Sequence, residues 1–223
     1  MRRWPVNTLE PDTLLCTTRS VRKRLDFERP VARGVIEDCL EVAFQAPNGS
    51  NLNAWRWIVV DDPTLVQAAA GIYNQGLDAY VKELGEAVGD AYLGASVPGH
   101  DRIAESVDHL RENLHRAPAL LLPLFAGRTE GASVFMQASL WGSIIQATWS
   151  FFLALRSRGL GSAWTTGHLM REEAMADLLG IPFDRYTQVG LFPIAYTVGT
   201  DFRPAYRKPL QEVVGWNEFR VLG

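Results

Sequence analysis

Cysteine is scarce in this chain, which has only two among its 223 residues, Cys16 and Cys39. They lie too far apart for a redox pair of the CxxC type and are too few to hold a structural zinc ion. We therefore expect two reduced thiols, as in a cytoplasmic protein. The spacing of His100, His109 and His115 fits no known metal signature, so we predict surface histidines and no metal site.

The chain also lacks a large excess of either charge, because 22 basic and 25 acidic residues leave a net charge of −3. Nothing in this balance marks the whole surface as a nucleic-acid binder. Residues 1–3 begin like an export leader, but residues 4–12 lack the apolar run that has to follow, so no export signal is expected. The absence of a GxGxxG fingerprint argues against a Rossmann dinucleotide site but not against the use of NADH or NADPH.

Residues 131–155 contain no charged side chain. The stretch is long enough to span a bilayer. However, polar residues such as Gln137, Ser143 and Gln146 recur through it, and each would need a hydrogen-bond partner in hydrocarbon. Two interpretations follow: a membrane helix, or a helix buried on nearly all sides in a soluble protein, as an obligate dimer provides.

The remaining elements alternate between helices and strands. The apolar spacing and the turn formers predict helices over 8–25, 35–44 and 171–180, and strands over 55–60, 119–125, 163–166 and within 186–198. Pro123 indicates that the second of these strands lies at a sheet edge or carries a bulge. The order of elements indicates one domain in which helices and strands are mixed.

Residues 64–116 form the least regular part of the sequence. A short helix at 65–70 is followed by a glycine-rich stretch with several tyrosines, and residues 102–116 are again helical and charged. We expect this polar excursion between two strands to act as a lid or cover over a site.

Two basic clusters lie nearly two hundred residues apart. Arg19, Arg22, Lys23 and Arg24 fall within six residues, with hydroxyls at Thr18 and Ser20, and the second cluster holds Arg203, Arg207 and Lys208. A solvated helix end is the ordinary interpretation of such a run. An anion site is the alternative, because guanidinium groups bind phosphate through paired hydrogen bonds.

The loop at 46–55 carries three asparagines and no charge before Arg56. Its amides suit a neutral ligand with several donors and acceptors, such as a heteroaromatic ring. Turn formation by the asparagine side chains alone is the other interpretation, and the sequence leaves both open.

Four motifs occur in the order and spacing of the FMN-dependent nitroreductase superfamily, which the chain resembles over residues 12–215. They are TRSVR at 18–22, APNGSNLNAW at 46–55, ALRSRGLGSAWTTG at 154–167 and RKPL at 207–210. The resemblance implies an α+β fold with a mixed, mostly antiparallel sheet flanked by helices, a long central buried helix and an intertwined homodimer. It also implies one FMN-binding domain over residues 1–223 with residues 64–116 as a lid, and it favours the dimer helix over the membrane span.

The resemblance also implies the residues that hold FMN. Arg19, Ser20 and Arg22 resemble those that bind the phosphate and the ribityl chain, and Arg207 resembles a C-terminal cation at the same phosphate. The partner subunit's loop lies against the flavin ring in the family, and Trp164, Thr166 and Gly167 resemble the segment beside flavin N5 and O4. The loop residues that match are Pro47, Asn48, Gly49 and Asn51.

Three departures from the family pattern leave the subgroup open. Thr18 stands where many members carry another arginine, Asn53 and Ala54 replace the commoner Gln-Pro, and residues 149–150 replace a frequent Gln-Asn pair.

The function implied is cytoplasmic reduction of nitroaromatics, quinones or similar small electron-poor compounds, with NADPH or NADH as electron donor. No catalytic side chain is expected, because the hydride chemistry belongs to the flavin. Two alternatives remain: a specialised flavoenzyme, either dehalogenase-like or flavin-fragmenting, and a non-catalytic flavin-sequestering protein.

Overall fold

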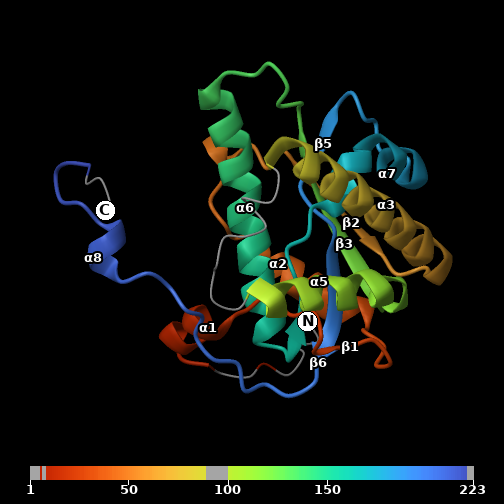
Figure 1. The fold of residues 1–223 in the computed structure, drawn as a ribbon, viewed down its shortest axis with the longest axis horizontal. Helices are drawn as coiled ribbons and strands as arrows, with labels where there is room; N and C mark the ends of the chain where they lie inside the picture. Colours follow the sequence, from red (N-terminus) through yellow and green to blue (C-terminus); the bar gives the residue numbers. More distant parts are fainter. Residues whose placement is uncertain (1–5, 7–8, 89–99, 220–223) are drawn as a thin grey trace.

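The chain folds as helices packed on an antiparallel sheet, as the computed structural model of residues 6, 9–88 and 100–219 shows (Figure 1). The sheet has six strands: β1 (Leu25–Asp26), β2 (Trp55–Val60), β3 (Ala119–Ala126), β4 (Leu160–Gly161), β5 (Tyr186–Gln188) and β6 (Phe192–Thr197). The described helices are α1 (Pro11–Thr17), α2 (Arg33–Ala43), α3 (Pro63–Val88), α5 (His100–Asn113), α6 (Val134–Arg156), α7 (Glu172–Leu179) and α8 (Leu210–Val213). Short 3-10 turns form η1 (Gly49–Asn51), η2 (Leu114–Arg116) and η3 (Gly167–Arg171). The predicted α+β class is confirmed.

Strand β3 lies in the middle of the sheet, so of the two alternatives predicted at Pro123, an edge strand or a bulge, the edge strand is wrong. All of β2 pairs with one side of β3, while β6 pairs with residues 119–121 and β5 with residues 124–126 on its other side. Pro123 falls between the segments paired with β6 and β5, and its carbonyl accepts from the Val189 amide at 3.0 Å. A proline is tolerated here because the neighbouring ladder is interrupted at its position.

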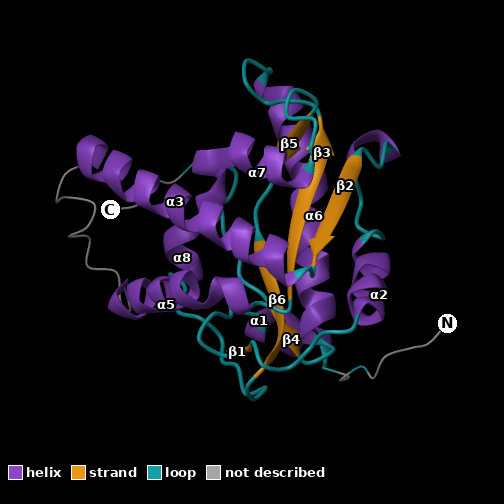
Figure 2. Cartoon of the chain, turned by 90° about the vertical axis from the view of Figure 1, so that its right-hand side faces the viewer, coloured by secondary structure: helices purple, strands orange, loops and turns teal. Residues whose placement is uncertain are grey.

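Both faces of β3 are buried. Leu120, Leu122 and Leu124 belong to one core cluster, whereas Leu121 and Phe125 belong to the other. This alternation follows from the period of two along a strand. Helices α3, α5 and α7 cover the first face, and α2 and α6 cover the second (Figure 2). The sheet is therefore a central layer between two layers of helices.

Helix α6 begins where the side chain of Ser133 accepts a hydrogen bond from the Met136 amide. Its inner face is buried in the core at Ile144, Phe151 and Leu155, as helical spacing requires. By length and composition alone α6 could cross a bilayer, but 39% of its most apolar window is buried inside the protein. It is a core helix of this chain.

The outer face of α6 is uncovered and apolar in the single chain. The exposed fraction is 78% for Phe135, 42% for Ile145 and 41% for Trp149. Of the polar residues expected to be bonded, Gln137 donates to the Ala132 carbonyl and Ser143 to the Ser139 carbonyl. Gln146 is exposed instead. The expectation of burial on nearly all sides includes a partner subunit, so it stays a prediction.

Residues 163–166 do not form the predicted strand. Strand β4 ends at Gly161, and in the following segment Thr165 forms two hydrogen bonds with Leu191. The Leu191 amide donates to the Thr165 carbonyl at 3.0 Å, and the Thr165 hydroxyl donates to the Leu191 carbonyl. Because both of these contacts fall on one residue, no ladder extends along the segment. It remains a fixed loop leading into η3.

Helix α3 is much longer than the predicted helix at 65–70, and Gly76 within it serves close packing rather than irregular structure. A β-carbon added at Gly76 would lie 2.0 Å from the carbonyl oxygen of Gly167. One added at Gly167 would meet Tyr73 and Leu77 at 2.9 Å. The two backbones therefore touch directly, which fixes the start of η3 against α3.

The C-terminal segment extends away from the body of the protein. Figure 1 shows α8 standing apart from the sheet and its helices. Its large apolar side chains have no cover in the single chain, with exposed fractions of 70% for Tyr206, 80% for Trp216 and 90% for Phe219.

The contact between Gly76 and Gly167 predicts opposite effects of one substitution at two positions of α3. Gly71 has no atom within 4 Å of an added β-carbon, so Gly71→Ala should stabilise the protein by about 0.5–1 kcal/mol through helix propensity. Gly76→Ala should instead destabilise it by about 1–3 kcal/mol, because the methyl group overpacks the contact. Urea unfolding of both variants measures this, and an equal gain for both would contradict the packing described.

Candidate functional site

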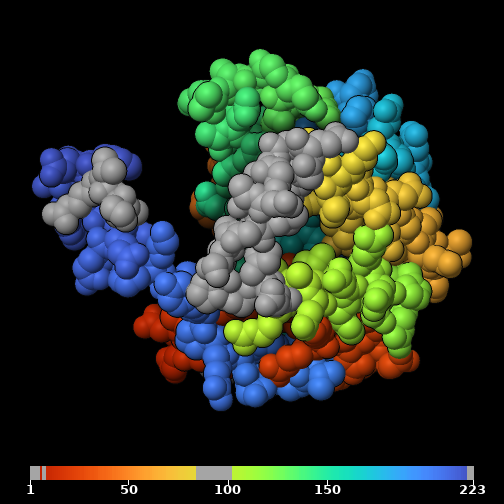
Figure 3. Space-filling view, in the orientation of Figure 1, coloured from red at the N-terminus to blue at the C-terminus, as the bar shows by residue number. Residues whose placement is uncertain are grey.

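A basic cleft of about 540 Å³ opens where the turn after α1, helix α5 and the segment after β6 meet. In Figure 3 the yellow-green surface of α5 adjoins the red surface of the N-terminal segment. The predicted basic clusters converge here, because Arg19 and Arg203 both line the cleft and Arg19 donates to the Arg203 carbonyl at 3.4 Å. Ser20 and Arg22 also line it.

Positive charge in this cleft is only partly neutralised. Lys23 pairs with Glu105 at 2.8 Å, and Arg24 pairs with Asp201 at 2.7 Å. Among the described residues no carboxylate pairs with Arg22, which is half-buried. Burial lowers the pKa of Arg22, with the nearby Tyr73 opposing this change. A guanidinium removed from water without a counter-ion favours binding of an anion.

Arg207 does not line the cleft. Its guanidinium is exposed and donates to the Tyr206 carbonyl at 2.7 Å. In the single chain the C-terminal cation at the cleft is Arg203, which sequence analysis placed in the same cluster without assigning it a role.

A second cavity, of about 470 Å³, shares Arg22 with the basic cleft. Its lining includes Trp164, Thr166 and Gly167 from the predicted ring-side segment. Tyr73, Leu77 and Tyr80 of α3, Val107 of α5, and Leu169 and Met170 of η3 also line it. The structure therefore brings six of the predicted residues to two adjoining cavities: Arg19, Ser20, Arg22, Trp164, Thr166 and Gly167.

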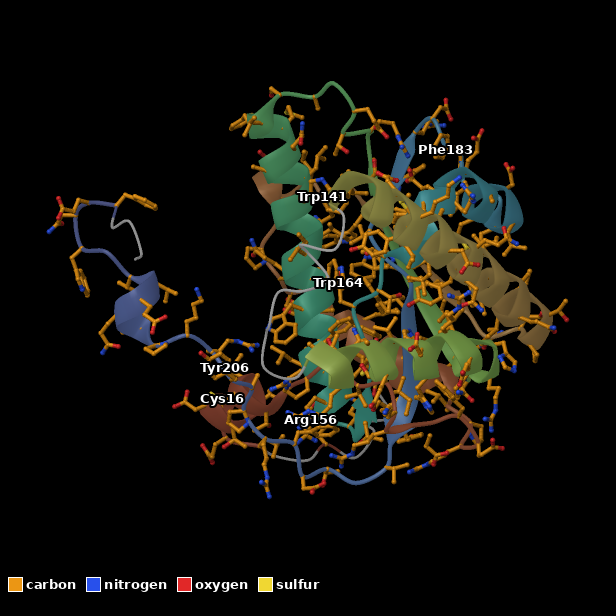
Figure 4. The ribbon with its side chains drawn as sticks, viewed as in Figure 1. Cys16, Trp141, Arg156, Trp164, Phe183 and Tyr206 are labelled. Carbon is orange, nitrogen blue, oxygen red and sulfur yellow. The ribbon has the colours of Figure 1, made fainter. Side chains whose placement is uncertain are left out.

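Trp164, which Figure 4 labels, is held in the second cavity by aromatic packing. Its ring centroid lies 4.9 Å from that of Phe192 and 6.3 Å from that of Phe152. Both phenylalanines are buried. Such pairs add to the stabilisation gained by burial, so Trp164 forms a fixed wall.

The amide-rich loop lies against α6 and lines neither cavity. Asn48 and Gly49 instead line a pocket of about 90 Å³ with Ser139 and Ser143. The Gly49 amide donates to Ser143 Oγ at 2.9 Å, and a β-carbon at Gly49 would lie 2.9 Å from Ser139 Oγ. This position therefore leaves no room for a side chain.

The asparagine side chains of this loop bond mainly within it. Asn48 Oδ1 accepts from the Asn53 amide at 2.9 Å, and Asn53 Nδ2 donates to the Asn51 carbonyl at 2.9 Å. Ser50, Asn51 and Asn53 have φ near +50°, a region that asparagine tolerates. In one chain the amides therefore shape the turn. Pro47 and Asn51 are exposed.

His168 is a buried residue beside the site that sequence analysis missed. It directly follows the motif residue Gly167 and is fully buried, and burial lowers its pKa to about 4, with Gln188 partly opposing the change. Both ring nitrogens and the Gln188 side-chain oxygen lack bonded partners among the described residues. A ring N–H of His168 and the side-chain oxygen of Gln188 are a complementary donor and acceptor. This pairing indicates a neutral histidine that supports η3. Its place directly after Thr166 and Gly167 was the only sequence signal.

The predicted lid is described in part. Helices α3 and α5 contribute Tyr73, Tyr80 and Val107 to the second cavity. Tyr92, one of the tyrosines in the glycine-rich stretch of the predicted lid, lies outside the described residues. Arg102 and Ser106 of α5 line the basic cleft, and no sequence motif pointed to either.

Comparison with known proteins places this chain in a family. The model of the Nitroreductase family matches residues 16–196. An NADH dehydrogenase of Thermus thermophilus is 28% identical over 226 aligned positions, covering 93% of this chain and 96% of that protein. An iodotyrosine deiodinase of Thermotoga neapolitana is 26% identical, covering 90% and 94%.

A solved structure has the same fold. The FMN and NADPH-dependent nitroreductase NfnB from Sphigopyxis sp. strain HMH is 24% identical, has a TM-score of 0.66 and covers 95% of this chain and 100% of its own. Because the family model spans most of the chain and the fold agrees, this chain belongs to the Nitroreductase family.

Proposed function

We propose that this protein is an FMN-dependent oxidoreductase that takes electrons from NADPH or NADH and reduces small electron-poor aromatic compounds such as nitroaromatics or quinones. The observation that supports this best is Arg22, which has no carboxylate partner among the described residues and lines both the basic cleft and the second cavity. A ligand with an anionic end and an aromatic end fits such a pair of cavities. FMN has both.

The residues present fit FMN at each end. Arg19, Ser20 and Arg22 offer charge-assisted and hydroxyl hydrogen bonds to a phosphate. Trp164, Thr166 and Gly167 would lie beside the ring. Arg207 stays a proposed phosphate contact, although it does not line the cleft of the single chain.

When bound, FMN supplies the redox chemistry by accepting hydride at N5 and passing electrons to a second substrate. The chain's own contribution is to bind and orient. Thr166 would donate a hydrogen bond from its exposed hydroxyl, and the fixed Trp164 limits the poses of an aromatic substrate. Tyr73, Leu77 and Met170 make much of the remaining lining apolar, which would limit water beside the reacting groups.

The proposed assembly is a homodimer formed through α6 and the C-terminal segment. The uncovered face of α6 and the exposed side chains of residues 206–219 leave more apolar surface open than a monomer usually shows. In the dimer the partner's Pro47, Asn48, Gly49 and Asn51 would complete the ring site, which accounts for their absence from the cavities of one chain. Such an interface should bury more than about 2,000 Å². Residues 1–223 would form one cytoplasmic domain.

Reductive dehalogenation is the second candidate function. The similarity to an iodotyrosine deiodinase favours it, as do Tyr73 and Tyr80 in the lining of the cavity, because tyrosine rings pack well against a halogenated phenol. It requires the same cofactor and differs only in the second substrate.

The purified protein should be yellow, and its colour should bleach without oxygen when NADPH or NADH is added. Absorbance spectra with each nicotinamide measure this directly. Adding a nitroaromatic, a quinone or 3-iodo-L-tyrosine to the bleached protein then distinguishes the candidate functions by which compound restores the colour. A colourless protein that does not take up added FMN would exclude both.

Replacing Arg22 with alanine should weaken FMN binding by about 1.5–3 kcal/mol, the scale of a charge-assisted hydrogen bond. Arg203→Ala should also weaken it, and Arg207→Ala shows whether the cation expected from the sequence contributes as well. Arg33→Ala is the control, because Arg33 pairs with Asp61 at the surface away from the cleft. Flavin release on dilution measures each affinity. If Arg22→Ala retained FMN as the wild type does, the phosphate would bind elsewhere.

A charge on the outer face of α6 should dissociate the dimer. Ile145→Glu places a carboxylate at the centre of that face, where burial without a partner is unfavourable, and light scattering should then report a monomer with less bound flavin. Val81→Glu is the matched control, since Val81 is 64% exposed on α3 and outside the proposed interface. A wild type that is already monomeric would argue against this assembly.

A further inference from the structure

Helix α5 contributes to both cavities, although it belongs to the segment expected to form a lid. Arg102, Ile103 and Ser106 line the basic cleft, and Val107 lines the second cavity. One helix therefore forms part of the wall of the basic cleft and part of the wall of the second cavity.

Two polar contacts fasten α5 to the basic turn. Glu105 pairs with Lys23 at 2.8 Å. Ser106 Oγ accepts from Arg22 Nη1 at 3.4 Å and donates to the Ile103 carbonyl at 2.8 Å. Because the hydroxyl proton is used within the helix, the lone pairs of Ser106 are directed to donors such as Arg22. Ser106 thus orients the guanidinium that joins the two cavities.

Arg102 adds a further positive charge to the same cleft. Among the described residues no carboxylate pairs with it, in contrast to Lys23 and Arg24. An arginine at the rim of a cleft that already holds Arg19, Arg22 and Arg203 experiences like-charge repulsion. A bound dianion would offset this repulsion, so a cation at this position of α5 favours binding of an anion in the cleft.

We propose that Arg102 binds the phosphate of FMN and that Ser106 positions Arg22 for the same phosphate, so that α5 is a third wall of the phosphate site. The proposal rests on the proposed function. Val107, which follows Ser106 on α5, lines the second cavity. Binding of the phosphate by α5 would therefore also fix this part of the wall of the second cavity. The cofactor's phosphate then sets the shape of the cavity in which the second substrate lies.

The test compares FMN with riboflavin, which has the same ring but no phosphate. Arg102→Ala should weaken binding of FMN about tenfold or more, as loss of a charge-assisted hydrogen bond does, and should leave binding of riboflavin unchanged. Arg111→Ala is the control, because it removes the same charge from the same helix, where Arg111 pairs with Asp78 outside the cleft. Flavin fluorescence on dilution of the loaded proteins reports each affinity.

Ser106 is tested by rescue. Ser106→Ala should lower the preference for FMN over riboflavin, and Ser106→Thr, which restores the hydroxyl, should recover it. Inorganic phosphate tests whether the site binds the phosphate group itself. It should compete with FMN but not with riboflavin, and Arg102→Ala should weaken this competition.

The outcomes separate this inference from the proposed function. A wild-type protein that binds neither flavin would contradict both. A wild type that binds FMN, together with an Arg102→Ala variant of unchanged preference for FMN over riboflavin, would overturn only the role of α5. Equal loss of both flavins in Arg102→Ala would also overturn it, because the residue would then act through the fold rather than the phosphate.

Discussion

The guanidinium of Arg22, which no carboxylate of the described residues neutralises, connects the basic cleft with the second cavity. It lies between the two cavities because its neighbour Val21 is anchored in the core, where the Val21 amide donates to the Ser162 carbonyl at 2.8 Å. A β-carbon at Gly161 would lie 2.7 Å from Thr197 Cγ2 and 3.1 Å from the Val21 side chain, so a larger residue at this position would push both neighbours aside. Two motifs far apart in the sequence are thus joined by one packing contact, which places charge next to an aromatic cavity.

Much of the fold follows from local patterns in the sequence. The charge-free stretch forms α6, and its C-terminus follows from Arg156 and the glycine at 159, which has φ of +75°. The two basic clusters meet where Arg19 donates to the Arg203 carbonyl, although Arg207, the cation that the resemblance indicated, does not line the cleft. These features depend on side-chain period and charge, both of which are visible in one sequence.

Other features depend on partners that a single sequence does not display. Pro123 suggested an edge strand or a bulge because proline has no backbone N–H to donate. Its strand is nevertheless central, and the proline lies between the part of β3 that pairs with β6 and the part that pairs with β5. Residues 163–166 have the composition of a strand, but Thr165 bonds to Leu191 and the Thr166 carbonyl accepts from Leu169 at the start of η3. Arg102 carries no motif, and its place at the cleft follows only from how α5 packs. Long-range pairing decides all three.

The glycine contact between α3 and η3 also limits how this protein can change. A β-carbon at Gly76 would meet the Gly167 backbone, so a side chain at this position would require α3 and η3 to move apart. Lining residues outside this contact, such as Tyr80, are less constrained. Variation at such residues would change the second cavity without disturbing the contact that holds the start of η3 against α3.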